Sequence, residues 1–260
     1  MGLSSSEIED LKTAKDILEH PGLAAKISTI VGSPLEKGFS MLPKKWNLVV
    51  NDAARKSIET ALNVALWTMD HSKPESRPSN WWHKLAAGTT GAAGGAFGIA
   101  ALAIELPVST TIMLRSIADI ARSEGENLGT PDARLQCIQV LALGGRSKSD
   151  DAAETAYFTA RAAMAKAVSD AAAYLTKKGF SDRGAPAIVR LIAQIASRFS
   201  VVVSEKAAAQ AVPIVGAFGG AIINTLFIDH FQDMGKGHFI VRRLERLHGP
   251  EEVRRMYEAL

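Results

Sequence analysis

The chain is poor in cysteine and in aromatic residues, and both shortages restrict its class. A single cysteine, Cys137, among 260 residues excludes an internal disulfide framework and is typical of a reducing compartment. Aromatic residues make up only 6% of the chain although 47% of it is hydrophobic, so aliphatic residues supply most of the apolar surface. This composition favours closely packed helices over sheets, and no stretch alternates as a strand would. We therefore expect an all-α fold.

Net charge is also low. The formal net charge is +3 and the pI is near 9.0, and Lys and Arg are interleaved with Asp and Glu almost everywhere. A nucleic-acid-binding surface needs a concentrated basic patch, so we predict no nucleic-acid partner. The N-terminus has no apolar signal region, so we expect a cytoplasmic protein, with peripheral attachment to the inner membrane left open.

The usual catalytic signatures are missing. The sequence contains no GxSxG, HExxH, CxxC or GxxxxGK[ST] motif. Cys137 has no histidine near it in the sequence, which is typical of a buried and inert thiol. We predict no cofactor.

What the chain does contain is an apolar block rich in glycine. Between Lys84 and Arg115, Glu105 is the only charged residue. Four glycines spaced by three or four residues share one face if the block is helical. They are Gly88, Gly91, Gly95 and Gly98. Because each helical glycine costs about 1 kcal/mol relative to alanine, the stripe indicates close approach by another backbone. Glu105 continues this face, and Pro107 is expected to break or kink the helix beyond it.

A second apolar block, residues 207–228, repeats the theme. It contains the tetrapeptide Gly-Ala-Phe-Gly, which also occurs in the first block. On its helix, Gly216 and Gly220 share a face with His230. We predict that the two glycine faces cross at close contact. The expected architecture is a single compact multi-helix domain around two central glycine-rich apolar helices.

Caps and breaks divide the rest of the chain into further helices. Thr130 is placed as an N-cap, and Gly235 with Gly237 is expected to interrupt the chain. Residues 32–45 contain glycine and proline and are expected to form a loop or short turn. Besides the two blocks, we expect helices at 6–20, 22–31, 46–69, 108–122, 131–143, 151–177, 185–205, 238–248 and 251–260.

Ionisable residues gather at the borders of the two blocks. The candidates for a ligand site or polar cluster are Glu105, Arg115, Asp119, Asp229, His230 and Asp233. Glu105 is interpreted either as a carboxylate favoured by a helix N-terminus or as a buried acid at a pocket. Arg115 is expected to reach Glu105 across the turn or to pair with Asp119 four residues later. Such a network specifies packing register without catalysing a reaction.

A metal site is the alternative interpretation of the same residues. His230 and Asp233 are one helical turn apart and would share a metal with Glu105 or Asp119, as in helical carboxylate sites. The paired Glu-x-x-His motifs that such sites normally use are missing.

Membrane contact is suggested by the length of the blocks and by what flanks them. Both are long enough to span a bilayer, but Glu105 and a mean hydropathy of +0.06 favour helices in a soluble core or dipping into a membrane face. Trp81 and Trp82 close the polar linker candidate 71–84, and are either interfacial anchors or a half-buried lid. A basic face near the C-terminus is either solvated or meets anionic lipid. Its residues are Arg242, Arg243 and Arg246.

Two regions of the sequence contain motifs that occur in the same order in a known protein family. The glycine-rich run leads into Glu-Leu-Pro at 105–107 and Leu-Arg-x-Ile-Ala-x-Ile-Ala at 114–121. Val-Pro-Ile-Val-Gly-Ala at 212–217 then precedes Phe231 and the segment 239–244. Over roughly residues 46 to 250, the chain resembles the EcsC family.

The resemblance implies an α-helical domain of bacterial type that acts at a membrane and has no assigned reaction. The acidic-Leu/Ile-Pro and Leu-Arg features of the family fall on Glu105, Pro107 and Arg115. The family is named for a protein encoded beside an ABC transporter, which makes a transporter or another membrane protein a candidate partner. Because the first 45 residues lie outside the resemblance, we divide the chain into an N-terminal helical extension (1–45) and an EcsC-like helical domain (46–260).

These features lead to three functional expectations. The preferred one is a non-enzymatic, membrane-peripheral or lipid-interacting accessory protein. The competing class is a metal-dependent hydrolase whose site lies between the two glycine-rich helices and uses carboxylate and histidine ligands. The third is a structural protein that packs its glycine-rich helices against those of a membrane partner.

Overall fold

The computed structural model describes most of the chain and contains helices as its only regular elements in that part. The described residues are 2–19, 23–31, 35–68, 98–145, 156–179, 184–212 and 216–260. The helices are α1 (Ser5–Glu19), α2 (Leu23–Val31), α3 (Leu35–Met41), α4 (Trp46–Thr68), α6 (Gly98–Ser123), α7 (Pro131–Leu143), α8 (Ala156–Lys178), α9 (Pro186–Ala211), α10 (Gly216–His248) and α11 (Pro250–Ala259). The predicted all-α fold is confirmed.

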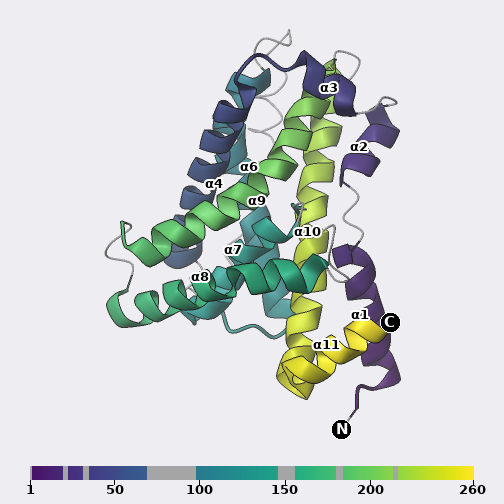
Figure 1. Ribbon diagram of the computed structural model, residues 1–260, viewed down its shortest axis with the longest axis vertical. Coiled ribbons are helices and arrows are strands. Elements are labelled where there is room, and N and C mark those ends of the chain that lie inside the picture. The colour runs from purple at the N-terminus through teal and green to yellow at the C-terminus, as the bar shows by residue number, and fades with distance from the viewer. Residues whose placement is uncertain are drawn as a thin grey trace.

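The longest helix, α10, runs through the length of the molecule (Figure 1). Helix α6 lies beside it in the same direction, since Ser116 bonds Gln232 at 2.8 Å and Glu126 bonds Arg242 at 2.7 Å. Helix α9 packs against both with the opposite direction and also covers α3 and α4. One end of the molecule is therefore built from α3, the beginnings of α4, α6 and α10, and the end of α9. We call it the upper end, after its place in Figure 1.

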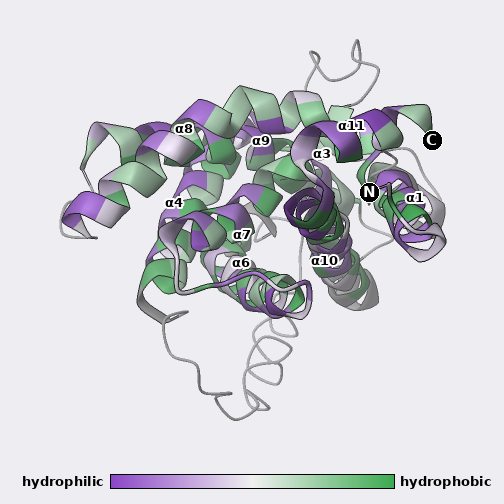
Figure 2. Cartoon of the chain, turned by 90° about the horizontal axis from the view of Figure 1, so that it is seen from below, coloured by the Kyte–Doolittle hydropathy of each residue, from purple (hydrophilic) through white to green (hydrophobic). Residues whose placement is uncertain are grey.

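The opposite end carries α1, α11 and both chain termini (Figure 1). Seen from below, α10 lies between α6 on one side and α1 on the other (Figure 2). Close packing of α1 depends on Gly237, where an added Cβ would stand 2.8 Å from Leu18 Cγ and 3.2 Å from the carbonyl oxygen of Ala14. The first helix is thus tightly joined to the centre of the fold.

Several sequence-based boundaries are confirmed by the structure. Thr130 caps α7, because its hydroxyl accepts a hydrogen bond from the backbone N–H of Ala133 at 3.3 Å. Helix α4 begins at Trp46 as expected. Along α9 the buried side chains recur every three or four residues, as an amphipathic core helix requires.

Three local predictions are wrong. Helix α6 continues through Pro107 rather than ending there, so Glu105 lies inside a helix and not ahead of one. Residues 32–45 are not all loop, because α3 forms within them. Gly235 and Gly237 do not interrupt the chain but lie inside α10, where their missing side chains admit α6 and α1.

The structure describes only part of the two glycine faces that were predicted to cross. Gly88, Gly91 and Gly95 lie outside the described residues. At Gly220, no described atom lies within 4 Å of the position that a Cβ would take. The tightest approaches occur elsewhere: a Cβ at Gly38 would stand 2.1 Å from the carbonyl oxygen of Ala208, and one at Gly145 would stand 2.2 Å from that of Arg198.

Candidate functional site

A buried lysine is the most unusual polar group in the described core. The Lys206 side chain on α9 is completely buried, and its Nζ donates to Glu105 Oε1 on α6 at 2.7 Å. The same ammonium donates to Asn224 Oδ1 on α10 at 2.8 Å and lies 4.6 Å from the centroid of the Phe227 ring. Three helices thus meet at one charge, close to where the second apolar block begins.

Burial and pairing act on this lysine in opposite directions. Removal from water lowers the pKa of Lys206, whereas the Glu105 carboxylate favours the charged form and opposes that decrease. The Glu105 side chain is only 12% exposed, so each charge depends on the other for compensation. A desolvated lysine is a potential nucleophile only when neutral, but here Glu105 favours the charged form, and two of the three N–H donors bond Glu105 and Asn224. The arrangement suits a structural clamp between α6, α9 and α10.

The structure separates Arg115 and Asp119 from Glu105. Arg115 is exposed, and Glu105 takes Lys206 as its partner instead. Asp119 pairs at 2.6 Å with Arg122 one turn later on the same helix, and 76% of its side chain is exposed. Sequence reasoning placed Glu105 in a polar cluster, but it missed Lys206 and Asn224.

The candidate residues at the end of the second block lie in different environments. His230 is buried, and its Nε2 donates to the carbonyl oxygen of Gly144 at 3.2 Å. Burial lowers the pKa of His230 to about 4, against a raising contribution from that hydrogen bond. Asp229 is exposed, and Asp233 forms a half-exposed pair with Lys26 at 3.5 Å. His230 therefore packs the α7–α10 contact rather than joining Glu105.

These positions give no support to the metal-site prediction. Within the described ranges, no group of three or more His, Cys, Asp or Glu side chains is placed to hold a metal ion. The four residues proposed as ligands each have a different environment: Glu105, Asp119, His230 and Asp233.

The basic C-terminal candidates meet carboxylates on neighbouring elements. Arg242 bonds Glu126 at 2.7 Å and Asp132 at 3.1 Å, and Arg246 also pairs with Glu126. Arg243 lies 2.6 Å from Asp10 on α1 and 3.3 Å from Glu124. The three arginines thus join α10 to α1 and to the α6–α7 turn. The two tryptophans proposed as membrane anchors, Trp81 and Trp82, lie outside the described residues.

A second polar cluster joins α8 to α10 and was not anticipated from the sequence. Arg161 donates to the Glu245 carboxylate from its two terminal nitrogens, Nη1 and Nη2, at 2.8 and 3.0 Å. Its Nη1 also donates to the Tyr157 hydroxyl at 3.2 Å. That hydroxyl lies 3.0 Å from Nδ1 of His238, which is fully buried. Burial lowers the pKa of His238 well below its usual value, and two nearby arginines add to the effect. Tyr157 lies on the buried face of α8, whose apolar residues recur every three or four positions, but this periodicity does not indicate which residues the tyrosine meets.

Large apolar side chains are exposed mainly at the upper end. Ile104 near the start of α6 is 77% exposed and Leu48 at the start of α4 is 61% exposed. Three further exposed apolar side chains belong to the same end: Met41, Val49 and Ile222. Nearby on α9, burial raises the pKa of Glu205 to about 7. The upper end therefore exposes several large apolar side chains outside and has the tightly paired Lys206 inside.

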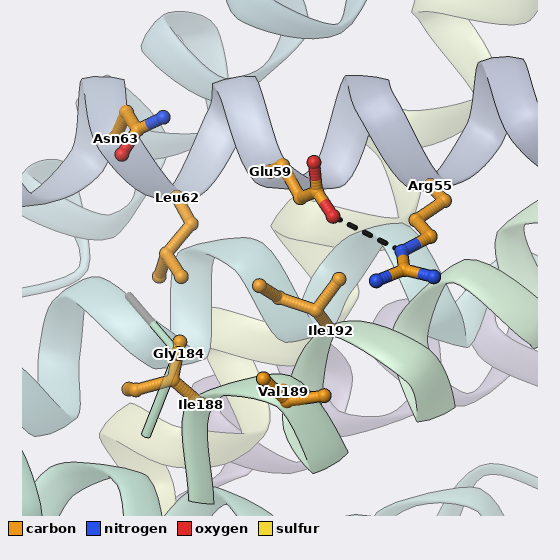
Figure 3. A pocket seen from close by; sticks show the side chains of 8 residues that line it. All are labelled: Arg55, Glu59, Leu62, Asn63, Gly184, Ile188, Val189 and Ile192. Carbon is orange, nitrogen blue, oxygen red and sulfur yellow. Dashed lines mark hydrogen bonds and ion pairs between the residues drawn. The ribbon is translucent and has the colours of Figure 1, made fainter. Parts of the chain in front are cut away.

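Two shallow cavities lie away from this end. One, of about 330 Å³, lies between α4 and α9 with Leu62 and Ile188 in its lining and the Arg55–Glu59 pair at 3.0 Å beside it (Figure 3). The other, of about 420 Å³, is lined by α7, α8, the end of α10 and α11, and includes Phe158 and Arg161. Neither contains the residues singled out from the sequence.

One described helix, α9, is long and apolar enough to cross a membrane by length and composition alone. Its most apolar window has a mean hydropathy of 1.5, and 44% of that window is buried inside the protein. The core helix of a soluble protein passes the same test, so this result is weak support for a span.

Comparison with known proteins gives a single family assignment. Neither the curated proteins nor the solved structures contain a match to the chain. The family model of the EcsC protein family matches residues 5–244. This match begins before residue 46, where the sequence resemblance started, and includes α1, which packs on α10. The motif order, the helical fold and this match together show that the chain belongs to the EcsC protein family.

Proposed function

We propose that this chain is a membrane-peripheral accessory protein that contacts lipid through its upper end. The observation that carries the proposal is the exposure of large apolar side chains on helix ends that share this end, led by Ile104 and Leu48. Exposed apolar side chains gathered in one region are typical of a protein or membrane contact, whereas scattered ones need no explanation. The other strongly exposed example, Leu247, lies at the opposite end of α10.

The two ends of the molecule have different surface chemistry, which supports an oriented contact. At the end opposite to the upper end, the arginines of α10 form ion pairs with Glu126, Asp132 and Asp10. Paired guanidinium groups contribute less to an attraction for anionic lipid than free ones, because their partners carry the same charge as the lipid. This difference supports a contact at the upper end rather than at the C-terminal arginines.

Flotation with liposomes tests the proposal. We expect the purified chain to float with vesicles, and we expect Ile104→Ser to reduce the bound fraction several-fold. The matched control is Leu247→Ser, which removes a similarly exposed aliphatic side chain (64% exposed) at the other end and should leave binding unchanged. Absence of wild-type binding to both neutral and anionic vesicles would end the proposal.

The same proposal specifies a location and a class of partner. A peripheral protein of this kind would act from the cytoplasm at the inner membrane, where a transporter or another integral membrane protein would be within reach. Affinity isolation from detergent-solubilised membranes, with Ile104→Ser as the comparison, distinguishes a protein partner from lipid alone.

A further inference from the structure

We propose that the corner between α3 and α4, residues 36–49, binds the surface of anionic lipid bilayers. The inference rests on the proposed function, because it assigns a lipid class to the same upper end. It adds an electrostatic contact that the apolar residues of α6 and α10 do not provide.

The corner is held rigidly against the core on its inner side. Leu35 and Gly38 are buried, and Gly38 is so close to α9 that no Cβ would fit against the Ala208 carbonyl. The short helix α3 therefore turns its other face outward, where Lys37 and Met41 are exposed four residues apart. The buried inner face therefore fixes which side of α3 points outward.

The turn that follows presents more exposed residues in a compact form. Lys45 has a φ of 68°, and the backbone N–H of Trp46 bonds the carbonyl of Pro43 at 3.1 Å. The side chains of Lys44, Lys45 and Leu48 are all exposed, and burial resumes only at Val50. The turn thus brings lysines and aliphatic side chains together on the outside of the molecule.

An aromatic pair supports this surface from beneath. The Trp46 and Phe39 rings lie 5.7 Å apart between their centroids, and both side chains are only partly buried. Tryptophan with one apolar and one wet side is favoured at a membrane interface.

The charge of the corner complements an anionic surface. Its three lysines, Lys37, Lys44 and Lys45, face one exposed carboxylate in the same segment, Glu36. Where the chain is described, none of the three lysines takes part in an ion pair, in contrast with Arg242 on α10. Lysines interleaved with inserted aliphatic residues are the arrangement by which peripheral proteins recognise anionic lipid.

The expected size of the effect follows from the three charges. Each lysine near an anionic bilayer strengthens binding by about fivefold at low salt. Replacing Lys37, Lys44 and Lys45 by glutamine should therefore weaken binding to anionic vesicles by on the order of a hundredfold. Binding to neutral vesicles, which depends on the apolar side chains, should change little.

The test is vesicle co-sedimentation with phosphatidylcholine alone and with phosphatidylcholine containing phosphatidylglycerol. Wild type and the triple variant are compared with a control in which Lys166, Lys177 and Lys236 are replaced by glutamine. The control lysines are exposed on α8 and α10. Because each variant loses three lysines, the net charge changes equally in both. Thermal unfolding confirms that the variants remain folded.

The inference is supported if wild type and control prefer the anionic vesicles, the corner variant loses that preference, and added salt weakens wild-type binding. It is overturned if wild type binds both vesicle types equally, or if the corner variant still prefers anionic vesicles as wild type does. In either case, binding of wild type to vesicles would leave the proposed function standing. Failure of wild type to bind any vesicle would remove both.

Discussion

Lys206 Nζ lies 2.7 Å from Glu105 Oε1, although the two residues are 101 positions apart in the chain. Their side chains are 0% and 12% exposed, so neither charge is well hydrated. Breaking a buried pair by removing one partner is far more costly than removing both, because the remaining charge stays desolvated. This asymmetry makes the pair suitable for a double-variant experiment.

We predict that Lys206→Met lowers the free energy of unfolding by about 3–5 kcal/mol. The methionine fills similar space, but it leaves the Glu105 carboxylate without its partner and Asn224 without its donor. Urea unfolding followed by circular dichroism and by fluorescence measures the change and checks that both probes report one transition.

The control is the double variant Lys206→Met/Glu105→Leu. It removes both charges and should recover most of the loss, to within about 1–2 kcal/mol of wild type. Equal losses in the single and double variants would mean that removing the stranded carboxylate recovers no stability, and the clamp interpretation would then be wrong.

Glycine positions give a second prediction with an internal control. Gly38→Ala would place a Cβ 2.1 Å from the Ala208 carbonyl oxygen, so α3 must move away from α9. We expect a loss of about 1–3 kcal/mol, as for other overpacked sites. The midpoint of thermal unfolding provides the measurement.

Gly220→Ala should act in the opposite direction. Position 220 lies within α10, and no described atom lies within 4 Å of the place that its Cβ would occupy. Alanine should therefore stabilise the helix by about 0.5–1 kcal/mol. A decrease in stability would instead indicate the close helix crossing that the glycine pattern predicts.

The sequence predicted the class of fold because periodicity is a local property. The start of α4 at Trp46 and the Thr130 cap of α7 are both determined within a few residues of chain, and both are confirmed. Pro107 misled because the packing of α6 against α4 and α10 maintains a helix that local propensity alone would end.

The contacts of Lys206 with Glu105 and Asn224 were harder to predict from the sequence because these residues come from helices far apart in the chain. Glu105 was identified from its isolation in an apolar block, but nothing local distinguishes Lys206 from a lysine that ends a block at the surface. The available signal was that Lys206 precedes three alanines, all of them buried, on the face that α9 turns inward. A lysine on a buried stripe requires a carboxylate, and Glu105 was the unmatched one.

His230 should make the folded protein less stable as the pH falls from about 7 to 5, whereas Glu205, whose pKa burial raises to about 7, acts in the opposite direction. Burial lowers the pKa of this histidine to about 4 in the folded protein, from an ordinary value of 6.5. Between these values the unfolded chain binds the proton and the folded chain does not, so acid favours unfolding. The contribution of His230 at pH 5 is about 2 kcal/mol.

His230→Gln provides the comparison, because its amide nitrogen is still able to donate to the Gly144 carbonyl. On going from pH 7 to pH 5, the free energy of unfolding of the variant, measured by urea unfolding, should change by about 2 kcal/mol in the stabilising direction relative to that of wild type. Some dependence should remain, because burial also lowers the pKa of His238. An unchanged pH dependence would mean that folding does not lower the pKa of His230.

The carboxylate of Glu126 should matter for stability and not for lipid binding. It is 5% exposed and receives Arg242 and Arg246 together, so Glu126→Gln leaves two guanidinium groups without their main partner. We expect a loss of about 2–4 kcal/mol in urea unfolding. The control Glu258→Gln, which removes an exposed pair with Arg254, should leave stability almost unchanged because solvent screens that pair. If freeing these arginines instead raises binding to anionic vesicles at constant stability, the C-terminal face is a membrane contact after all, and the assignment of that role to the upper end must be revised.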